Sequence, residues 1–149
     1  MTKRVWKVKT FSELTAPELY QIIKARVDVF VVEQDCPYPD LDGYDQNALH
    51  LWTEEDGAVL AYCRIFDQGI KYPECSIGRV LTTNLGRGKG IGKTLISYAI
   101  QVIENRLKKS EIRISAQDYL LQFYESFGFV DTGKKYLEDN IPHTEMYKK

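Results

Sequence analysis

The chain has 149 residues, in which 20 Lys and Arg nearly balance 21 Asp and Glu. This length fits one domain, residues 1–149, and the charge balance provides no strong field for nucleic acid or an anionic membrane. The 3 cysteines lack the spacing of a disulfide framework or a thiolate zinc site, and no apolar signal region or long apolar run is present. We therefore expect a soluble, cytoplasmic, metal-free protein.

The first half of the chain predicts one long helix among strands. Thr15-Ala16-Pro17-Glu18 has the residues of a capping box, with proline in the first helical turn. Apolar residues then recur on one helical face as far as Phe30, and an acidic, proline-containing loop follows between Asp35 and Tyr44. Strands are expected at Val5–Lys9, Leu49–Thr53 and Ala58–Phe66.

A glycine-rich segment connects the next expected strand, Ile77–Thr82, to a second helical pattern. Its sequence is Arg87-Gly88-Lys89-Gly90-Ile91-Gly92. Alternating glycines let the backbone turn tightly and leave successive N–H groups uncovered at the positive end of a helix. Such a segment favours a ligand that carries a diphosphate. The alternative is a glycine-rich turn that binds no ligand.

Three phosphate-binding loops compete for this segment, and their spacing separates them. A P-loop, Gly-x-x-x-x-Gly-Lys-Ser/Thr, fits the tail Gly92-Lys93-Thr94, but its first glycine would fall at Arg87. A dinucleotide fingerprint, Gly-x-Gly-x-x-Gly, that starts at Gly88 would need glycine where the chain has Lys93. The acetyltransferase loop, Arg/Gln-x-x-Gly-x-Gly/Ala, matches Arg87, Gly90 and Gly92 at every fixed position.

The remainder of the chain predicts another strand, a short helix and two final strands. The strand is expected at Ile112–Ala116, and apolar spacing from Tyr119 to Phe127 indicates the helix, with Gly128 as its C-terminal stop. The resulting order is β-α-loop-β-β-β-α-β-α-β-β. This order predicts a mixed α/β fold of the α+β kind, with helices on both faces of a central sheet.

Two motifs in this order resemble the GNAT N-acetyltransferase superfamily. The glycine loop is followed by Tyr124-Glu125-Ser126-Phe127-Gly128-Phe129, which is similar to the Tyr-Glu-x-x-Gly-Phe element of these enzymes. The segments Val29-Phe30-Val31-Val32-Glu33-Gln34 and Ile141-Pro142-His143 resemble the ElaA-like branch. The resemblance runs from about residue 5 to the C-terminus and implies a central, mixed, mostly antiparallel sheet.

The resemblance also implies acetyl-CoA as cosubstrate and assigns residues to it. The Val80 N–H would be the oxyanion donor, Gln117 stands where many members have an asparagine, and Tyr124 would protonate the leaving thiolate. Asn84 departs from a frequent proline, which loosens the turn. The expected cofactor-binding residues are Val80, Leu81, Thr82, Arg87, Gly88, Lys89, Gly90, Ile91, Gly92, Lys93, Gln117 and Tyr124.

The general base stays open at this point. Histidine is suited to removing a proton near neutral pH, and the acidic loop is either a solvated surface or an attraction for a cationic amine. Glu33 and His50 join Tyr124 as the expected catalytic residues, and a water molecule is a further alternative. The full set of candidate bases is Glu33, Asp42, Asp45, His50 and His143.

The sequence thus predicts an acetyl-CoA-dependent N-acetyltransferase in which an amine attacks directly within a ternary complex. A covalent route through Cys36 is disfavoured, because no orienting histidine neighbours it in the sequence. One alternative is a non-catalytic acyl-CoA-binding sensor, and a second is a P-loop-like nucleotide hydrolase. The acceptor would be a small-molecule or peptidyl amine, with no nucleic-acid or membrane partner. The superfamily resemblance is also compatible with a homodimer.

Overall fold

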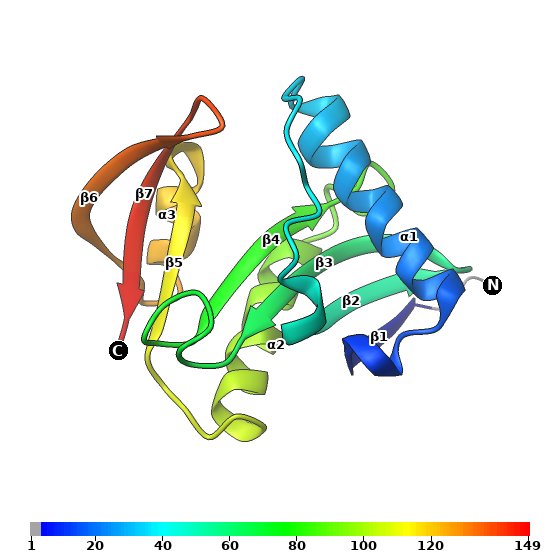
Figure 1. Ribbon diagram of the computed structural model, residues 1–149, viewed down its shortest axis with the longest axis horizontal. Helices are drawn as coiled ribbons and strands as arrows, with labels where there is room; N and C mark the ends of the chain where they lie inside the picture. Colours follow the sequence, from blue (N-terminus) through cyan, green and yellow to red (C-terminus); the bar gives the residue numbers. More distant parts are fainter. Residues whose placement is uncertain (1–3) are drawn as a thin grey trace.

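The computed structural model describes residues 4–149 and contains two antiparallel sheets flanked by helices (Figure 1). The order of elements is the one predicted, and the predicted fold class is confirmed. The helices are α1 (Ala16–Arg26), α2 (Ile91–Asn105) and α3 (Leu121–Glu125). The strands are β1 (Arg4–Thr10), β2 (Leu49–Glu55), β3 (Ala58–Phe66), β4 (Ser76–Thr82), β5 (Ile112–Gln117), β6 (Val130–Glu138) and β7 (Ile141–Lys148).

The two sheets meet at one end and diverge at the other. The first has the strand order β1-β2-β3-β4 and the second β5-β7-β6. Just before β4, Cys75 pairs with Ile112 of β5 in a parallel bridge, and the Arg113 N–H donates to the Cys75 carbonyl at 2.9 Å. From this junction β4 and β5 run apart (Figure 1). Their C-terminal ends, at Thr82 and Gln117, therefore form the open end of a fork.

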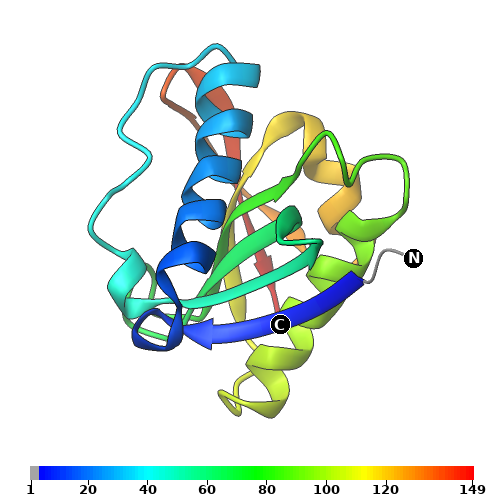
Figure 2. The same cartoon turned by 90° about the vertical axis from the view of Figure 1, so that its right-hand side faces the viewer.

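Helices α1 and α2 cover opposite faces of the first sheet (Figure 2). On one face, Ile22 of α1 packs in a cluster with Trp52 and Tyr62. On the other face, Leu95 of α2 packs with Leu60 and other side chains. Because β3 is buried on both faces, its apolar run lacks the alternation of a half-exposed strand. Among residues 4–149 no helix has the length and hydropathy to cross a membrane.

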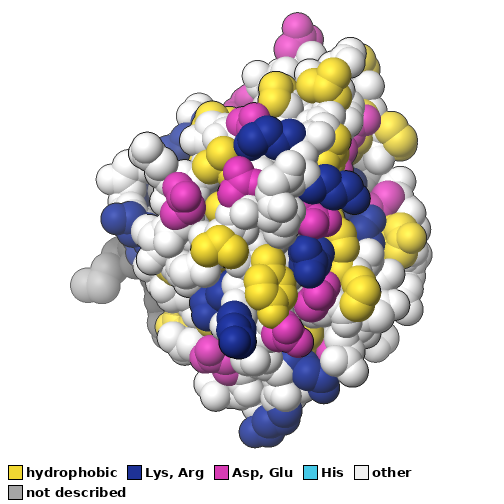
Figure 3. Space-filling model, turned by 90° about the vertical axis from the view of Figure 1, so that its left-hand side faces the viewer, with side chains coloured by type: hydrophobic (Ala, Val, Ile, Leu, Met, Phe, Trp, Pro, Cys, Tyr) yellow, Lys and Arg dark blue, Asp and Glu magenta, His cyan; other side chains and the backbone are white. Residues whose placement is uncertain are grey.

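The second sheet carries a charged outer surface. Strand β6 is exposed along most of its length, and Figure 3 shows basic and acidic side chains interspersed with hydrophobic ones on this side. Arg113 of β5 forms ion pairs with Glu74 at 2.9 Å and with Glu145 at 3.1 Å. Charged side chains of this kind discourage pairing of an edge strand with another chain.

The predicted capping box of α1 is present, but the helix does not continue as an α-helix to Phe30. Glu18 N–H donates to Thr15 Oγ1 at 3.2 Å, and Thr15 N–H donates to Glu18 Oε1 at 2.9 Å. After Arg26 the chain forms a π-helix over Val27–Glu33. The wider turn buries the neighbours Val29 and Phe30 together, which a 3.6-residue pattern cannot predict.

The short helix near the C-terminus is also shorter than expected. Its α-helical part is α3, preceded by a 3₁₀ turn at Asp118–Leu120. Tyr119 is 74% exposed, so it does not join the apolar face that its spacing predicted, whereas Tyr124 is buried. Gly128 has a φ of 96°, and its N–H donates to the Glu125 carbonyl at 3.0 Å. The predicted C-terminal stop is therefore confirmed.

A close backbone approach at Gly86 provides a first prediction. A Cβ added there would lie 2.3 Å from the Leu60 carbonyl oxygen, which a backbone cannot easily avoid. We expect Gly86→Ala to lower the free energy of unfolding by about 1–3 kcal/mol, as overpacked sites do. At Gly78 an added Cβ meets no described atom within 4 Å, so Gly78→Ala is the matched control. Urea denaturation of both variants measures the difference, and equal stabilities would contradict the prediction.

Candidate active site

Strand β4 contains a bulge at the open side of the fork. Tyr62 pairs with Leu81 and Arg64 pairs with Gly78, so Arg79 and Val80 together face one residue of β3. Arg79 has a φ of 51°, in the left-handed region that side chains rarely adopt. A bulge leaves its extra residue outside the regular ladder of hydrogen bonds and re-aims the neighbouring groups. Val80, the predicted oxyanion donor, therefore belongs to the bulge, where the backbone groups do not follow the regular hydrogen-bond ladder of the sheet.

The unusual backbone at Arg79 is supported through its side chain. Arg79 Nε donates to Asp40 Oδ1 at 2.9 Å, and Nη2 donates to the Asp40 carbonyl at 2.9 Å. Its guanidinium lies over the Tyr38 ring, 5.4 Å from the centroid. These contacts fix the guanidinium and offset the cost of the left-handed conformation, which is of order 1–3 kcal/mol.

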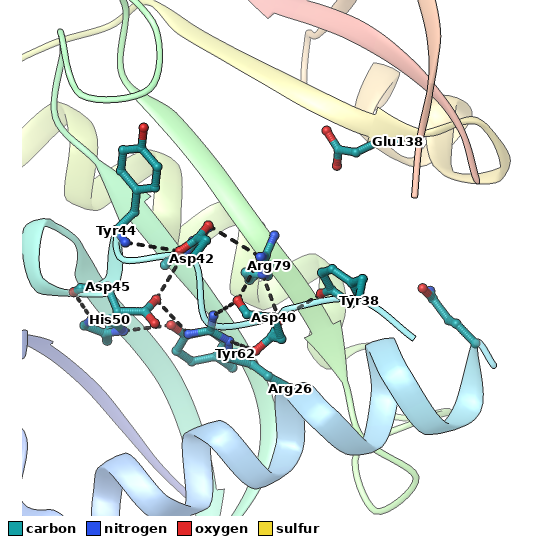
Figure 4. Close-up of polar contacts among 12 residues, drawn as sticks. Arg26, Tyr38, Asp40, Asp42, Tyr44, Asp45, His50, Tyr62, Arg79 and Glu138 are labelled. Carbon is teal, nitrogen blue, oxygen red and sulfur yellow. Dashed lines mark hydrogen bonds and ion pairs between the residues drawn. The ribbon is translucent and has the colours of Figure 1, made fainter. Parts of the chain in front are cut away.

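Arg79 belongs to a larger arginine–aspartate cluster (Figure 4). Arg26 pairs with Asp40 at 2.8 Å and with Asp45 at 2.7 Å, and Arg64 pairs with Asp45 at 2.8 Å. Arg26 and Arg64 are 1% and 2% exposed, so their charges need these partners. The members of the cluster are Arg26, Arg64, Arg79, Asp40, Asp42 and Asp45.

The cluster changes the interpretation of the acidic loop. We expected its carboxylates to be either solvated or available to a cationic amine, but Asp40, Asp42 and Asp45 are paired with arginines. Burial alone would raise the pKa of Asp45, yet the hydrogen bonds and charges of Arg26 and Arg64 outweigh it and lower that pKa. Arg64 lowers the pKa of Asp42 against the same opposition. Neither carboxylate is suited to remove a proton.

His50 lies inside the fold. Its exposed fraction is 0%, its Nε2 lies 2.9 Å from the Asp45 carbonyl and its Nδ1 lies 2.7 Å from Tyr62 Oη. A carbonyl only accepts, so Nε2 carries the proton and Nδ1 accepts from Tyr62. Burial lowers the pKa of His50. Because both nitrogens are bonded and no surface is exposed, the expected role of His50 as a base is not supported.

Glu33, the other expected catalytic residue besides Tyr124, lies at the end of the π-helix and is exposed. Its carboxylate accepts a hydrogen bond from Arg87 Nη2, which also donates to the Thr82 carbonyl at 2.9 Å. Glu33 lines a separate surface hollow beside α1, together with Gln21 and Asn84. The structure therefore gives Glu33 a contact with the glycine loop and places it away from Tyr124.

Two hollows meet between β4 and β5. The first, here called the groove, is lined by six of the expected cofactor-binding residues. The second, here called the cavity, contains Tyr124 and reaches the turn between β6 and β7. Both hollows are lined by Phe30, Gln34, Val80, Gln117 and Leu120. The six expected cofactor-binding residues that line the groove are Val80, Leu81, Thr82, Arg87, Gly92 and Gln117.

Two amide side chains bridge the junction of groove and cavity. Gln34 Nε2 lies 3.4 Å from Gln117 Oε1, and Gln117 Nε2 lies 3.5 Å from Gln34 Oε1. These distances are at the long limit for hydrogen bonds, so the contacts are weak. The bridge connects the end of the π-helix to the end of β5 across the open fork.

Tyr124 presents its hydroxyl from a buried aromatic ring. The side chain is 6% exposed and packs edge-on against Phe123 and Phe129, with centroid distances of 5.3 and 5.8 Å. The residue lines the cavity. Burial raises the pKa of Tyr124, so the phenol is protonated at neutral pH and is a weaker acid than an exposed tyrosine.

His143 lines the same cavity as Tyr124. Its Nδ1 lies 2.7 Å from the Ile141 carbonyl, which requires a proton on Nδ1. In the neutral ring Nε2 then keeps its lone pair, 3.5 Å from Glu138 Oε2. The ring is 6% exposed and stacks on Tyr136 at an interplanar angle of 14°. Among the candidate bases, His143 is the one that lines the cavity together with Tyr124.

The glycine loop is open to a ligand. Gly88 and Gly90 have φ values of 78° and 70°, and a Cβ added at either would meet no described atom within 4 Å. Gly90 is the N-cap of α2 and provides no side-chain hydrogen bond, so the first N–H groups of the helix face outward. Lys89 and Lys93 are exposed beside them. These features fit a diphosphate.

The described residues, 4–149, contain no group of His, Cys, Asp or Glu that could hold a metal ion. Cys36 is partly exposed beside the cavity, whereas Cys63 and Cys75 are buried. Burial raises the pKa of the Cys63 thiol, which makes it unreactive.

Comparison with known proteins defines the family. The model of the GNAT acetyltransferase domain matches residues 12–149. Protein ElaA of Escherichia coli is 35% identical over 143 residues, which cover 95% of this chain and 94% of ElaA. A UPF0039 protein of Synechocystis is 36% identical over 142 residues, covering 95% of this chain and 92% of that protein.

Solved structures agree with the sequence comparison. The crystal structure of Escherichia coli ElaA has a TM-score of 0.90 and 33% identity, and the match covers 99% of this chain and 100% of that one. The crystal structure of an acyl-CoA N-acyltransferase from Pseudomonas aeruginosa has a TM-score of 0.93 and 38% identity, with coverage of 99% and 100%. The chain therefore belongs to the GNAT acetyltransferase family, in its ElaA-like branch. The family implies an acyl-CoA cosubstrate and an amine acceptor.

Sequence reasoning missed the residues that support and complete the cavity. Arg64 lies within the apolar run of β3, and a charge in such a run requires a buried partner, so this signal was available. Arg26 on the apolar face of the first helix gave the same signal. Nothing local indicated that Gln34, Arg79 and Glu138 would line one cavity, because they come from distant segments.

The arginine–aspartate cluster makes a prediction about stability. Asp45→Asn leaves Arg26 and Arg64 without a shared carboxylate, and we expect it to lower the free energy of unfolding by roughly 3–5 kcal/mol near neutral pH. Because the folded pKa of Asp45 is depressed, its contribution is present above about pH 4 and is lost as the pH falls further. Denaturant titrations should therefore show wild type and variant converging in acid.

The control for this variant is Asp28→Asn. Asp28 forms an exposed pair with Lys24 on the helix surface at 2.8 Å. Its loss should cost no more than about 0.5 kcal/mol. Similar losses for the two variants at neutral pH would show that burial of the cluster has no special effect.

Proposed function

We propose that this protein is an acetyl-CoA-dependent N-acetyltransferase in which the amine attacks directly within a ternary complex. The observation that carries the proposal is the meeting of two hollows at the β4–β5 fork. The groove gathers residues expected to hold acetyl-CoA, and the cavity presents a proton donor, Tyr124, and a proton acceptor, His143. Acetyl-CoA would supply the thioester that carries the acetyl group.

Main-chain groups would hold the cofactor. The outward N–H groups from Gly88 to Gly92 would bind the diphosphate, and Lys89 and Lys93 are placed to add positive charge. The edge of β4 from Val80 to Thr82 and the Gln117 amide would bind the arm that carries the thiol. Val80 N–H, redirected by the bulge, would stabilise the oxyanion, an interaction typically worth about 2.7–4 kcal/mol.

Two side chains would move the protons. Tyr124, which lines the cavity, would donate its phenolic proton to the leaving thiolate. His143, with Nδ1–H held by the Ile141 carbonyl, would accept the proton of the amine at Nε2. Glu138, 3.5 Å from that nitrogen, would stabilise the imidazolium that forms. His143 thus replaces His50 and Glu33 as our proposed base.

Binding and turnover measurements test the proposal. Calorimetry should detect binding of acetyl-CoA, and thiol release with a panel of amines should exceed release without an amine. Binding without turnover on any amine would favour the sensor alternative. Protection against heat by ATP with magnesium, but not by acetyl-CoA, would favour the nucleotide hydrolase.

We expect Tyr124→Phe to lower kcat about 100-fold or more while acetyl-CoA binding stays close to that of wild type. The ring and its packing against Phe123 and Phe129 are kept, so the loss isolates the hydroxyl. Tyr20→Phe is the matched control, because Tyr20 is 66% exposed on α1 and lines neither the groove nor the cavity. Steady-state thiol release measures both variants, and an unchanged kcat for Tyr124→Phe would remove this residue from the mechanism.

We expect His143→Gln to lower kcat/KM by about 100-fold or more, because the amine then loses the group proposed to accept its proton. His50→Gln should instead lower thermal stability, since it breaks the buried contacts with Tyr62 and Asp45, while the folded fraction keeps its kcat. The kcat/KM and the melting temperature of each variant are the measurements. The opposite assignment of effects would return the role to His50.

A further inference from the structure

One donor group of Arg79 is directed at no protein acceptor. Its Nε and Nη2 are engaged by Asp40, and Nη2 also lies 3.4 Å from Asp42 Oδ2. The side-chain hydrogen bonds of Arg79 to residues in the described range 4–149 involve only Nε and Nη2, so Nη1 is left over, and the side chain is 18% exposed. Since Arg79 lines the cavity, the two N–H groups on Nη1 are available to a molecule there.

The cluster fixes the position of this donor and carries no net charge, because its three arginines and three aspartates cancel. Arg79 therefore attracts a ligand at short range, through its N–H groups, and not through a long-range positive field. Its stacking on Tyr38 and its bonds to Asp40 restrict the rotation of the guanidinium. A prearranged guanidinium binds a carboxylate oxygen with little further loss of side-chain entropy.

The opposite wall of the cavity has the opposite character. Glu138 comes from the end of β6 and lines the cavity with Arg79 and Tyr38, and Figure 4 shows it apart from the arginine–aspartate cluster. Its side chain is 49% exposed, and its carboxylate lies 3.5 Å from His143 Nε2. A carboxylate at this position favours the ammonium form of an amine, next to the proposed base that would deprotonate it.

A contact joins two segments that line the cavity. Cys36, in the loop after the π-helix, lies with its Sγ 3.4 Å from the Asp139 carbonyl in the β6–β7 turn. Both residues line the cavity. A cavity whose walls are joined in this way favours a small acceptor over a segment of a folded protein.

We propose that the acceptor is a small amino-carboxylate, whose amine lies at Glu138 and His143 and whose carboxylate binds Arg79 Nη1. This inference rests on the proposed acetyltransferase function and names its substrate class. It differs from a preference for polyamines, because the loop carboxylates that would attract several cationic groups are already paired with arginines.

Matched acceptor pairs test the proposal. Thiol release from acetyl-CoA is measured with amino acids and with the amines that lack only their carboxylate. We expect kcat/KM to favour the carboxylate-bearing member of the best pair at least about tenfold, the size of one charged hydrogen bond. A preference for the simple amine, or for polyamines, would overturn the proposal while leaving acetyl transfer intact. Absence of acetyl-CoA binding would instead overturn the function itself.

Two variants locate the selectivity. Arg79→Lys keeps a charge for Asp40 but removes Nη1, so the ratio of kcat/KM within a pair should fall toward one, mainly through KM of the amino acid. Glu138→Gln should raise KM similarly for the amino acid and for the matching amine, so the ratio of their kcat/KM values should stay unchanged. Thermal unfolding and acetyl-CoA affinity confirm that each variant is folded. A ratio that is unchanged in Arg79→Lys, or one lost equally in both variants, would contradict the assigned orientation.

Discussion

The structure around the site depends on one ion-paired contact, that between Arg79 and Asp40. Arg79 is the residue that gives β4 one position more than β3 at the bulge, and its backbone has a φ of 51°. Without a bound side chain this conformation would be unfavourable. Asp40 is itself held by buried Arg26 of α1. The helix, the acidic loop and the bulged strand are therefore coupled through a single carboxylate.

Coupling of this kind explains why charged groups are buried in a small protein. Burying Arg26 and Arg64 is costly unless their hydrogen bonds are satisfied, and Arg64 Nε has no partner within residues 4–149. A hydrophobic replacement could pack as well as the cluster does. It could not, however, define both the position of the loop and the direction of Arg79. We infer that the cluster is retained for geometry around the cavity more than for stability.

The order of elements, the capping box at Thr15 and the stop at Gly128 were predictable because each depends on a few neighbouring residues. The glycine loop was predictable for the same reason, and the groove brings six expected residues together. The π-helix was not, since no local pattern distinguishes it from an α-helix. The burial of His50 and the position of His143 in the cavity were also not predictable. Strands buried on both faces lack the alternation that would show which way a histidine points.

The amide bridge between Gln34 and Gln117 joins a residue that the sequence predicted at the site to one that it did not. Gln117 was expected from the family pattern, whereas Gln34, the residue that ends the π-helix, was not expected at this position. Bonds of 3.4 and 3.5 Å contribute little, so a better partner for the Gln117 amide would replace Gln34. In the proposed function the cofactor arm is such a partner. Its entry along the groove would then release Gln34 at the boundary of the acceptor cavity, which connects occupancy of one hollow to the shape of the other.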